Sequence, residues 1–141
     1  METFAPAGGS RVLVVEDDAS LRRLLEMRLS AEGYTVRVAE DGQVAVEVLA
    51  SWIPDIILSD VMMPRMSGLS LCRAVRSDHR IRSLPVILLT ARQFDADVQA
   101  VMELGNVEFM NKPFDAAALH AALDRGLRPA ATDSAQATTG R

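Results

Sequence analysis

The side chains of this chain that could carry out chemistry are acids, a hydroxyl and an ammonium that follow short apolar runs. They are Glu16, Asp17, Asp18, Asp60, Thr90 and Lys112. Continuous runs of Val, Ile and Leu are typical of strands buried on both faces of a parallel sheet. Because parallel strands end at one edge of their sheet, where open α/β sheets bind ligands, we expect these polar groups to converge there. Asp60, directly after the predicted strand at residues 56–59, is the candidate for the reacting group.

The chemistry that this set of groups favours is attack on a phosphoryl group. Clustered carboxylates repel one another, and Mg²⁺ is the natural hard cation to neutralise them through oxygen ligands. A carboxylate oxygen can attack phosphorus and form an aspartyl phosphate. The Lys112 ammonium can bind one phosphate oxygen, and the Thr90 hydroxyl can donate to another. The pattern therefore predicts a site that depends on Mg²⁺, with Asp60 as the nucleophile.

Each of these side chains also has a plainer interpretation. Asp60 taken alone fits a strand-end turn or a helix cap, and only its combination with the other strand-end groups favours a reactive role. Asp18 fits the N-cap of the following helix better than a metal ligand. Lys112 could be a surface lysine, although the apolar strand before it and Pro113 after it favour an inward position. Thr90 could be a hydroxyl that is satisfied at its strand end.

Three further titratable side chains are assigned no role in the chemistry. Cys72 is predicted to be a small buried hydrophobe. His79 lies in a polar stretch and is predicted to be exposed. His120, on the last predicted helix, is expected to be exposed or to form part of a face that binds a partner.

Strand-like and helix-like patterns alternate five times along the chain. This alternation predicts an α/β fold in which a doubly wound, five-stranded parallel sheet is covered by helices on both faces. The predicted strands are residues 12–15, 34–38, 56–59, 86–89 and 107–110. The first helix is predicted from Leu21, Leu24, Leu25 and Leu29 at helical spacing. Helix starts are predicted at Asp41, at Asp95 or Asp97, and at Asp115.

Length and composition fit one globular domain. The chain has 141 residues, a net charge of −4 and 49% hydrophobic residues. Residues 1–10 are predicted to be a disordered N-terminal arm, residues 11–128 the domain, and residues 129–141 a disordered tail or linker. The mild acidity argues against direct nucleic-acid binding, and no apolar stretch is long enough to predict a membrane span. The missing export signal and the single Cys72 favour a cytoplasmic location.

Four segments together resemble the receiver domain of the two-component response regulators. They are Val14-Val15-Glu16-Asp17-Asp18, Ser59-Asp60-Val61-Met62-Met63-Pro64, Leu89-Thr90-Ala91 and Lys112-Pro113-Phe114, within a resemblance that runs from about Arg11 to Leu127. Each segment alone is a weak signal, but their order, spacing and position at strand ends are highly specific. The resemblance implies a flavodoxin-like (βα)5 fold with the strand order 2-1-3-4-5 of the chemotaxis receivers.

By this resemblance Asp60 is the phosphoacceptor and Mg²⁺ is the cofactor. Asp60 itself and Asp17 resemble the carboxylates that bind the metal directly. Glu16 resembles the neighbouring acid that acts through a metal-bound water. The backbone carbonyl of Met62 matches the third protein ligand.

The resemblance also assigns a conformational switch. Thr90 matches the switch hydroxyl, and Lys112 matches the lysine that binds the phosphoryl group. Phe109 matches the switch aromatic, although a role in the core is an equally good interpretation. A cis peptide bond between Lys112 and Pro113 is implied as well.

Two features depart from the usual receiver pattern. Met62 and Arg92 lie two residues beyond Asp60 and Thr90, at positions that resemble those that tune dephosphorylation. Because the apolar Met62 cannot orient an attacking water, we expect a long-lived phosphoryl group. Residues 106–108 replace the small and acidic residues that are usual before the last strand, which affects the partner face and not the chemistry.

The implied function is that of a phosphoacceptor signalling domain, which catalyses only its own phosphotransfer and dephosphorylation. The donor is expected to be the phosphohistidine of a sensor histidine kinase or of a histidine phosphotransfer protein, docked near Leu21, Arg22 and Leu25. Phosphorylation is expected to change the surface formed by the last two helices and the strand between them. A downstream protein reads this surface, and a homodimer could form through it on activation.

Other functions were weighed against this one. A haloacid-dehalogenase-type phosphatase also uses an Asp on a parallel sheet, but it needs a second Asp two residues later, where Met62 stands. A receiver-fold scaffold that works without phosphorylation is disfavoured because all the functional positions are filled. A nucleotide-binding Rossmann domain lacks its Gly-x-Gly-x-x-Gly segment after the first strand. A stand-alone regulator and a receiver cut from a longer chain are both compatible with the sequence.

Overall fold

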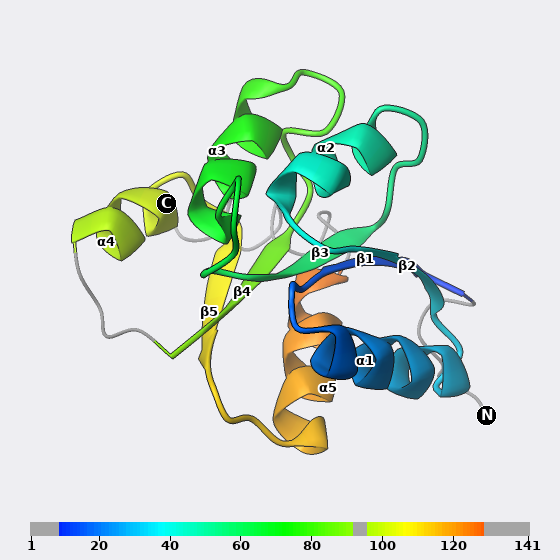
Figure 1. Ribbon diagram of the computed structural model, residues 1–141. Helices are drawn as coiled ribbons and strands as arrows, with labels where there is room; N and C mark the ends of the chain where they lie inside the picture. The colour runs from blue at the N-terminus through cyan, green and yellow to red at the C-terminus, as the bar shows by residue number, and fades with distance from the viewer. Residues whose placement is uncertain (1–8, 92–95, 129–141) are drawn as a thin grey trace, which may run out of the picture.

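Strands and helices alternate along the part of the chain that the structure describes. The computed structural model describes residues 9–91 and 96–128 (Figure 1). The strands are β1 (Arg11–Val15), β2 (Thr35–Ala39), β3 (Ile56–Asp60), β4 (Val86–Thr90) and β5 (Val107–Asn111). The helices are α1 (Ala19–Ala31), α2 (Gly42–Leu49), α3 (Gly68–Ser77), α4 (Ala96–Met102) and α5 (Ala116–Gly126). The predicted alternation is confirmed.

All the described strands belong to one parallel sheet with the order β2-β1-β3-β4-β5. The predicted fold class and the strand order implied by the resemblance are therefore confirmed. Val14 pairs with Leu58, and Asp60 pairs with Leu89. This register brings the carboxyl ends of β1, β3 and β4 to the same edge of the sheet.

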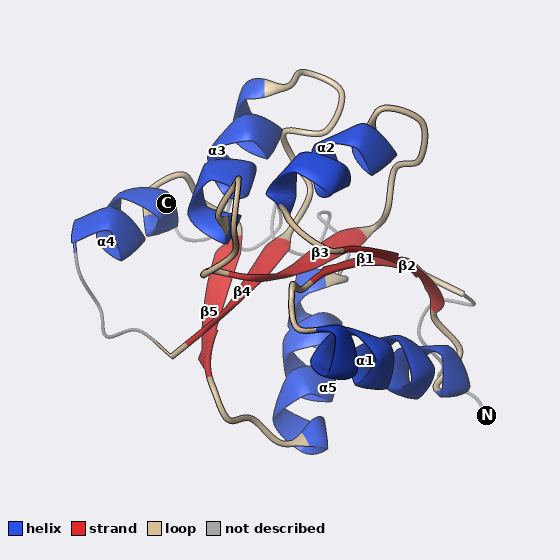
Figure 2. Ribbon diagram, in the orientation of Figure 1, coloured by secondary structure: helices blue, strands red, loops and turns tan. Residues whose placement is uncertain are grey.

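Helices cover both faces of this sheet. Figure 2 shows α1 and α5 on one face and α2, α3 and α4 on the other. Leu13 and Leu88 pack into the α2–α3–α4 layer, whereas Val14 and Leu58 pack into the α1–α5 layer. Every residue of β3 and β4 is buried, which explains their continuous apolar sequences. Within residues 9–91 and 96–128, no helix has the length and apolar character needed to cross a membrane.

One expectation near α1 was wrong. The second strand begins at Thr35 and not at Tyr34, because the Tyr34 N–H donates to the carbonyl of Leu29 at 3.1 Å and closes the turn after α1. Leu24 belongs to the apolar repeat that predicted α1, but 53% of it is exposed. Leu25 and Leu29 carry the buried face of this helix, and Leu24 lies beside that face.

Aspartates cap the described helices largely as predicted. Asp18, Asp41 and Asp115 cap α1, α2 and α5, and each carboxylate accepts from the N–H three residues later, at 3.0, 2.9 and 2.7 Å. The cap interpretation of Asp18 is thus confirmed. Asp97 lies inside α4, and Asp95 lies outside the described residues.

Candidate functional site

The carboxyl edge of the sheet holds the side chains that the sequence singled out. Glu16 directly follows β1, Asp60 and Thr90 end β3 and β4, and Lys112 directly follows β5. Backbone hydrogen bonds extend the register past the strand ends. The Glu16 N–H donates to the Ala39 carbonyl at 3.0 Å, and the Lys112 N–H donates to the Thr90 carbonyl at 2.9 Å. The fold therefore fixes where each of these side chains begins.

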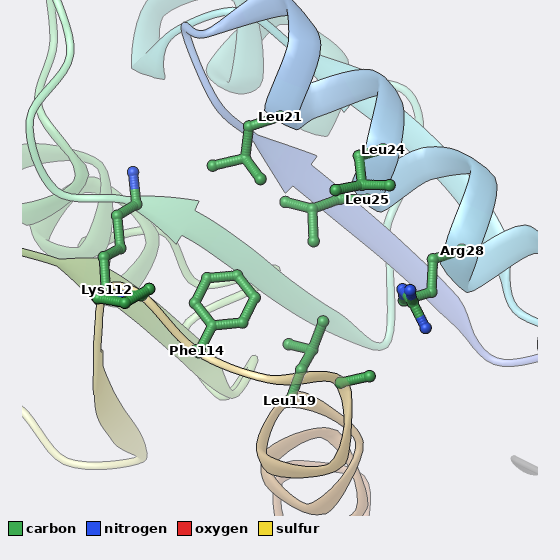
Figure 3. A pocket seen from close by; sticks show the side chains of 9 residues that line it. Leu21, Leu24, Leu25, Arg28, Lys112, Phe114 and Leu119 are labelled. Carbon is green, nitrogen blue, oxygen red and sulfur yellow. The ribbon is translucent and has the colours of Figure 1, made fainter.

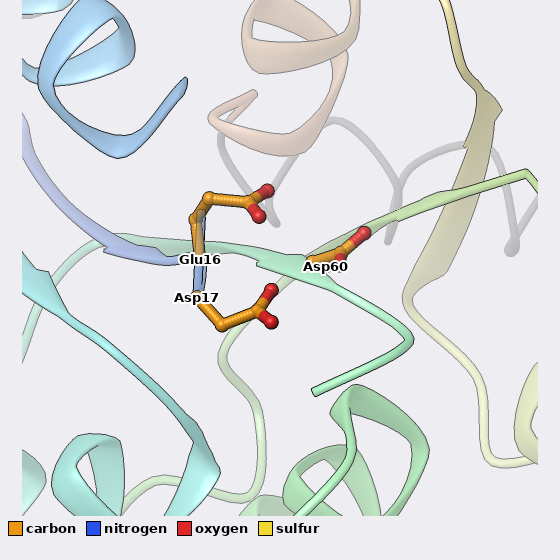
Figure 4. A group of neighbouring side chains, drawn as sticks. All are labelled: Glu16, Asp17 and Asp60. Carbon is orange, nitrogen blue, oxygen red and sulfur yellow. The ribbon is translucent and has the colours of Figure 1, made fainter. Parts of the chain in front are cut away.

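Among the described residues, three carboxylates meet at this edge (Figure 4). One oxygen from each of Glu16, Asp17 and Asp60 lies within 4.8 Å of the other two. Glu16 and Asp60 are 1% and 6% exposed, whereas Asp17 is exposed to solvent. The Asp18 N–H donates to Glu16 Oε2 at 3.1 Å and orients that carboxylate. Oxygen atoms grouped in this way suit a hard divalent cation.

Lys112 reaches into the acidic group from β5. Its Nζ lies 2.8 Å from Asp60 Oδ1 and 3.5 Å from Glu16 Oε1, and 26% of its side chain is exposed. The alternative that Lys112 is a solvated surface lysine is therefore wrong. The ammonium contacts both buried acids, so it partly balances their charge.

The pKa shifts at this edge indicate that Lys112 does not fully balance the charge of the buried acids. Burial raises the pKa of Glu16. Burial also raises the pKa of Asp60, with a contribution from the charge of Asp17, although Lys112 opposes the change. Burial alone would lower the pKa of Lys112, but Asp60 and Glu16 raise it above its ordinary value. Three acids thus face one ammonium at this edge, and a bound divalent cation would supply the missing positive charge.

The two switch candidates lie on adjacent strands. Thr90 is 4% exposed at the end of β4. Phe109 on β5 pairs with Leu88 and is partly buried against the α2–α3–α4 layer. This placement fits both a core residue and a side chain that can pack more deeply.

The methionines of the loop after β3 have different environments. Met63 and Met66 pack against the core, whereas Met62 is 61% exposed. Met62 lies two residues beyond Asp60, the last residue of β3, and is therefore outside the sheet. Arg92 lies outside the described residues. The Lys112–Pro113 bond is cis, as the resemblance implied.

A groove of about 450 Å³ opens between α1 and α5, next to the acidic edge (Figure 3). It is lined by Leu21, Leu24, Leu25, Arg28, Lys112, Pro113, Phe114, Ala116 and Leu119. Most of this lining is apolar, and Lys112 belongs both to the groove and to the site. Leu21 and Leu25 were named as docking residues, but the groove depends on how α1 packs beside the segment after β5.

Sequence reasoning missed two arginine contacts. Arg22 Nη1 donates to the Glu16 carbonyl at 2.9 Å, although Arg22 was considered only as a docking residue. Arg65 Nε donates to Asp41 Oδ2 at 2.8 Å, across 24 residues of sequence. Neither residue stands at a strand end or in a recognisable motif, so no signal in the sequence indicated these contacts.

The comparison with protein families decides the assignment. A family model for the response regulator receiver domain matches residues 12–124. This chain belongs to the response regulator receiver family. An aspartyl phosphate and bound Mg²⁺ are general features of receiver domains in two-component signalling, and the described residues of this chain include an acidic group.

Two curated response regulators illustrate the similarity. Response regulator PleD from Caulobacter vibrioides is 44% identical over 106 residues, which are 75% of this chain and 23% of PleD. Response regulator MprA from Mycobacterium ulcerans is 44% identical over 104 residues, which are 74% of this chain and 44% of MprA. The chain therefore spans less than half the length of these relatives, and only their receiver portion is compared.

Solved receiver structures share the fold over almost their whole length. The chemotaxis response regulator CheY4 of Vibrio cholerae is 32% identical, with a TM-score of 0.78, and the match covers 84% of this chain and 99% of CheY4. The receiver domain of sensor histidine kinase PA1611 from Pseudomonas aeruginosa is 32% identical, with a TM-score of 0.76. That match covers 84% of this chain and 98% of the other, which is described with a magnesium ion coordinated in the active site cleft.

Proposed function

We propose that this receiver domain accepts a phosphoryl group from a phosphohistidine onto Asp60 and thereby changes a surface that a partner protein reads. The observation that carries the proposal is the 2.8 Å contact between Lys112 Nζ and Asp60 Oδ1 within the acidic group. It puts a cation at the carboxylate oxygen where a phosphoryl group would be held. Membership of the receiver family supports the class of reaction.

The acidic group fits a magnesium ion by its donor chemistry. Carboxylate oxygens of Glu16, Asp17 and Asp60 lie within 4.8 Å of one another, and such oxygens are the ligands that Mg²⁺ prefers. Asp17 and Asp60 would bind the ion directly, with the Met62 carbonyl as the third protein ligand and Glu16 acting through a bound water. The ion would neutralise charge on the carboxylates and on the phosphoryl group.

Asp60 supplies the nucleophile in this proposal. An oxygen of its ionised carboxylate attacks phosphorus, and the P–N bond of the phosphohistidine breaks. The electron pair of that bond returns to the imidazole nitrogen of the donor. Lys112 exchanges part of its contact with Asp60 for a phosphoryl oxygen, and the Thr90 hydroxyl donates to another.

The proposed output surface consists of α4, β5 and α5. Thr90 draws toward the phosphoryl group, and Phe109, which is only partly buried, then packs more deeply. The populations of two arrangements of this surface shift as a result. A downstream protein reads the shifted surface, and a second copy of the domain can bind it.

We expect the phosphoryl group to be long-lived. The Met62 side chain is 61% exposed and carries no polar group that could orient a water for attack on phosphorus. Arg92 occupies the second tuning position by resemblance.

The proposed donor is a sensor histidine kinase or a histidine phosphotransfer protein that docks in the α1–α5 groove. Because Lys112 lines this groove and contacts Asp60, a protein seated there would present its phosphohistidine close to the acceptor. Leu24 and Met27 are 53% and 57% exposed and add apolar surface along α1. The phosphorylated unit is the domain at residues 11–128, acting in the cytoplasm.

Phosphorylation with acetyl phosphate and Mg²⁺ tests the proposal. Intact-mass spectrometry should detect a single phosphoryl adduct on the wild type and none on Asp60→Asn, because an amide cannot attack phosphorus. Asp124→Asn is the control, since it changes a carboxylate on α5 that is 59% exposed, and it should keep the adduct. An adduct that survives Asp60→Asn would contradict the proposal. A wild type that binds its kinase but is never phosphorylated would favour the scaffold alternative.

A further inference from the structure

The loop between β3 and α3 is tied to the start of α2 by an ion pair. Arg65 Nε donates to Asp41 Oδ2 at 2.8 Å, and Arg65 Nη2 lies 2.6 Å from the same oxygen. The other oxygen, Asp41 Oδ1, accepts from the Val44 N–H at 2.9 Å. The Asp41 side chain is 4% exposed and the Arg65 side chain 56% exposed. A single buried carboxylate therefore caps α2 and holds the neighbouring loop.

Backbone contacts hold the same loop at both of its ends. The Gly42 N–H donates to the Met66 carbonyl at 3.1 Å, and the Gly68 N–H donates to the Val61 carbonyl at 2.9 Å. A Cβ on Gly42 would lie 2.7 Å from the Met66 carbonyl oxygen, so the approach of α2 to the loop requires glycine. Between this loop and α2, Arg65 forms the only side-chain hydrogen bond and ion pair that the described residues show, and the Met66 side chain lies beside Gly42.

Arg65, which makes this contact with Asp41, has a positive φ. Its φ is 65°, in the left-handed region that glycine or asparagine adopts more readily than arginine. The same residue therefore combines a backbone conformation that arginine adopts less readily with the contact to Asp41.

We propose that the Asp41–Arg65 pair is a positioning device for Mg²⁺ binding, which sets where the loop presents the Met62 carbonyl to the ion. This inference rests on the proposed function, in which that carbonyl is the third protein ligand. Arg65 follows Met62 by three residues, with Pro64 between them. Because proline restricts the intervening backbone, a shift at Arg65 is transmitted toward Met62.

A purely electrostatic effect of Arg65 and Asp41 on the Mg²⁺ affinity predicts a different result, so it can be distinguished from a positioning effect. The positive charge of Arg65 alone would weaken Mg²⁺ binding, and the negative charge of Asp41 alone would strengthen it. Removal of the two charges should then change the affinity in opposite directions. Loss of the positioning contact should weaken binding in both cases.

The test measures the Mg²⁺ dissociation constant by NMR titration of backbone amides in Asp41→Asn and Arg65→Met. Asparagine caps a helix as well as aspartate does, but its single oxygen is needed for the cap and leaves none for Arg65. Methionine keeps an unbranched side chain at position 65. Both variants should bind Mg²⁺ roughly tenfold more weakly than the wild type, as expected for loss of a contact that orients a ligand. The double variant should be no weaker than either single one.

Arg80→Met is the matched control. Arg80 forms an ion pair with Asp78 at 3.0 Å and donates to the Leu49 carbonyl at 3.2 Å, at the other end of α2. This substitution also removes an arginine side chain that contacts α2, but it does not change the loop after β3. It should keep the wild-type dissociation constant, and circular dichroism should show that all the variants are folded.

Two outcomes would overturn this inference alone. One is wild-type affinity in both single variants, and the other is tighter Mg²⁺ binding by Arg65→Met with weaker binding by Asp41→Asn. Failure of the wild type to bind Mg²⁺ would instead overturn the proposed metal site together with the inference.

Discussion

Single residues decide the charge balance of this receiver site. Glu16 and Asp60 are buried acids, and Lys112 lies 2.8 Å from one and 3.5 Å from the other. Burial raises the pKa of both acids, which means that the folded protein disfavours their ionised forms. Before a cation binds, the site therefore works against the stability of the fold, and this cost can be measured.

Asp60→Asn should stabilise the domain in buffer that contains a metal chelator. The raised pKa of Asp60 implies that its charge is unfavourable above that pKa, so a neutral amide should raise the free energy of unfolding by on the order of 1 kcal/mol. Lys112→Met should act in the opposite direction and cost about 2 kcal/mol, because it leaves two buried carboxylates without their cation. Urea unfolding at pH 7 measures both. Destabilisation by Asp60→Asn would show that the Lys112 contact outweighs the burial of the charge.

At the scale of elements, the site depends on how closely α3 approaches the end of β3. Gly68 begins α3, and a Cβ at this position would lie 2.2 Å from the carbonyl oxygen of Asp60. Only glycine allows this approach, because the obstacle is backbone and cannot rotate away. The first turn of α3 and the proposed phosphoacceptor are thus packed as one unit.

Gly68→Ala should therefore destabilise the fold by about 3 kcal/mol and slow phosphorylation by acetyl phosphate, since overpacking displaces the end of β3. Gly126→Ala is the matched control. A Cβ there would lie 2.5 Å from Ile56 Cδ1, which is the end of a flexible side chain, so its cost should stay below about 1 kcal/mol. Unfolding curves and phosphorylation rates check both variants. Equal effects of the two substitutions would contradict the argument.

At the scale of the whole molecule, the acidic edge adjoins two surfaces that share α5. Lys112 lines the α1–α5 groove. Thr90 ends β4, which pairs with β5, and β5 is part of the proposed output surface. Binding of a donor can therefore involve α1, and reading of the signal can involve α4 and β5, while α5 contributes to both surfaces.

Leu24→Asp should slow phosphotransfer from a phosphorylated histidine phosphotransfer protein at least tenfold and leave phosphorylation by acetyl phosphate unchanged. Leu24 is 53% exposed, so the substitution removes a docking contact with little cost to the core. Met102→Asp, at a position on α4 that is 43% exposed, is the control and should leave both rates unchanged. Equal loss with both donors would place the defect in the chemistry and not in docking.

Local pattern in the sequence was sufficient for the fold class and for the residues at the sheet edge, whereas the strand order came from the resemblance to receiver domains. The continuous apolar sequences of β3 and β4 indicate strands that are buried on both faces of the sheet. The polar residue at the end of each strand indicates the carboxyl edge of the sheet. Parallel pairing then brings Asp60, Thr90 and Lys112 together without any long-range information. Local pattern was misleading where a side chain lay beside a buried face, as for Leu24.

Tertiary structure alone decided the contacts between distant segments. The orientation of Lys112 toward Asp60 depends on how β5 and β3 are placed on either side of β4, and the groove depends on how α1 lies against the segment after β5. The Asp41–Arg65 pair joins residues that are 24 positions apart and carry no shared pattern. Periodicity reports only which face of an element is buried, whereas the partner of a side chain is set by packing. The sequence thus determined which residues reach the edge of the sheet, and the packed molecule determined what each of them contacts.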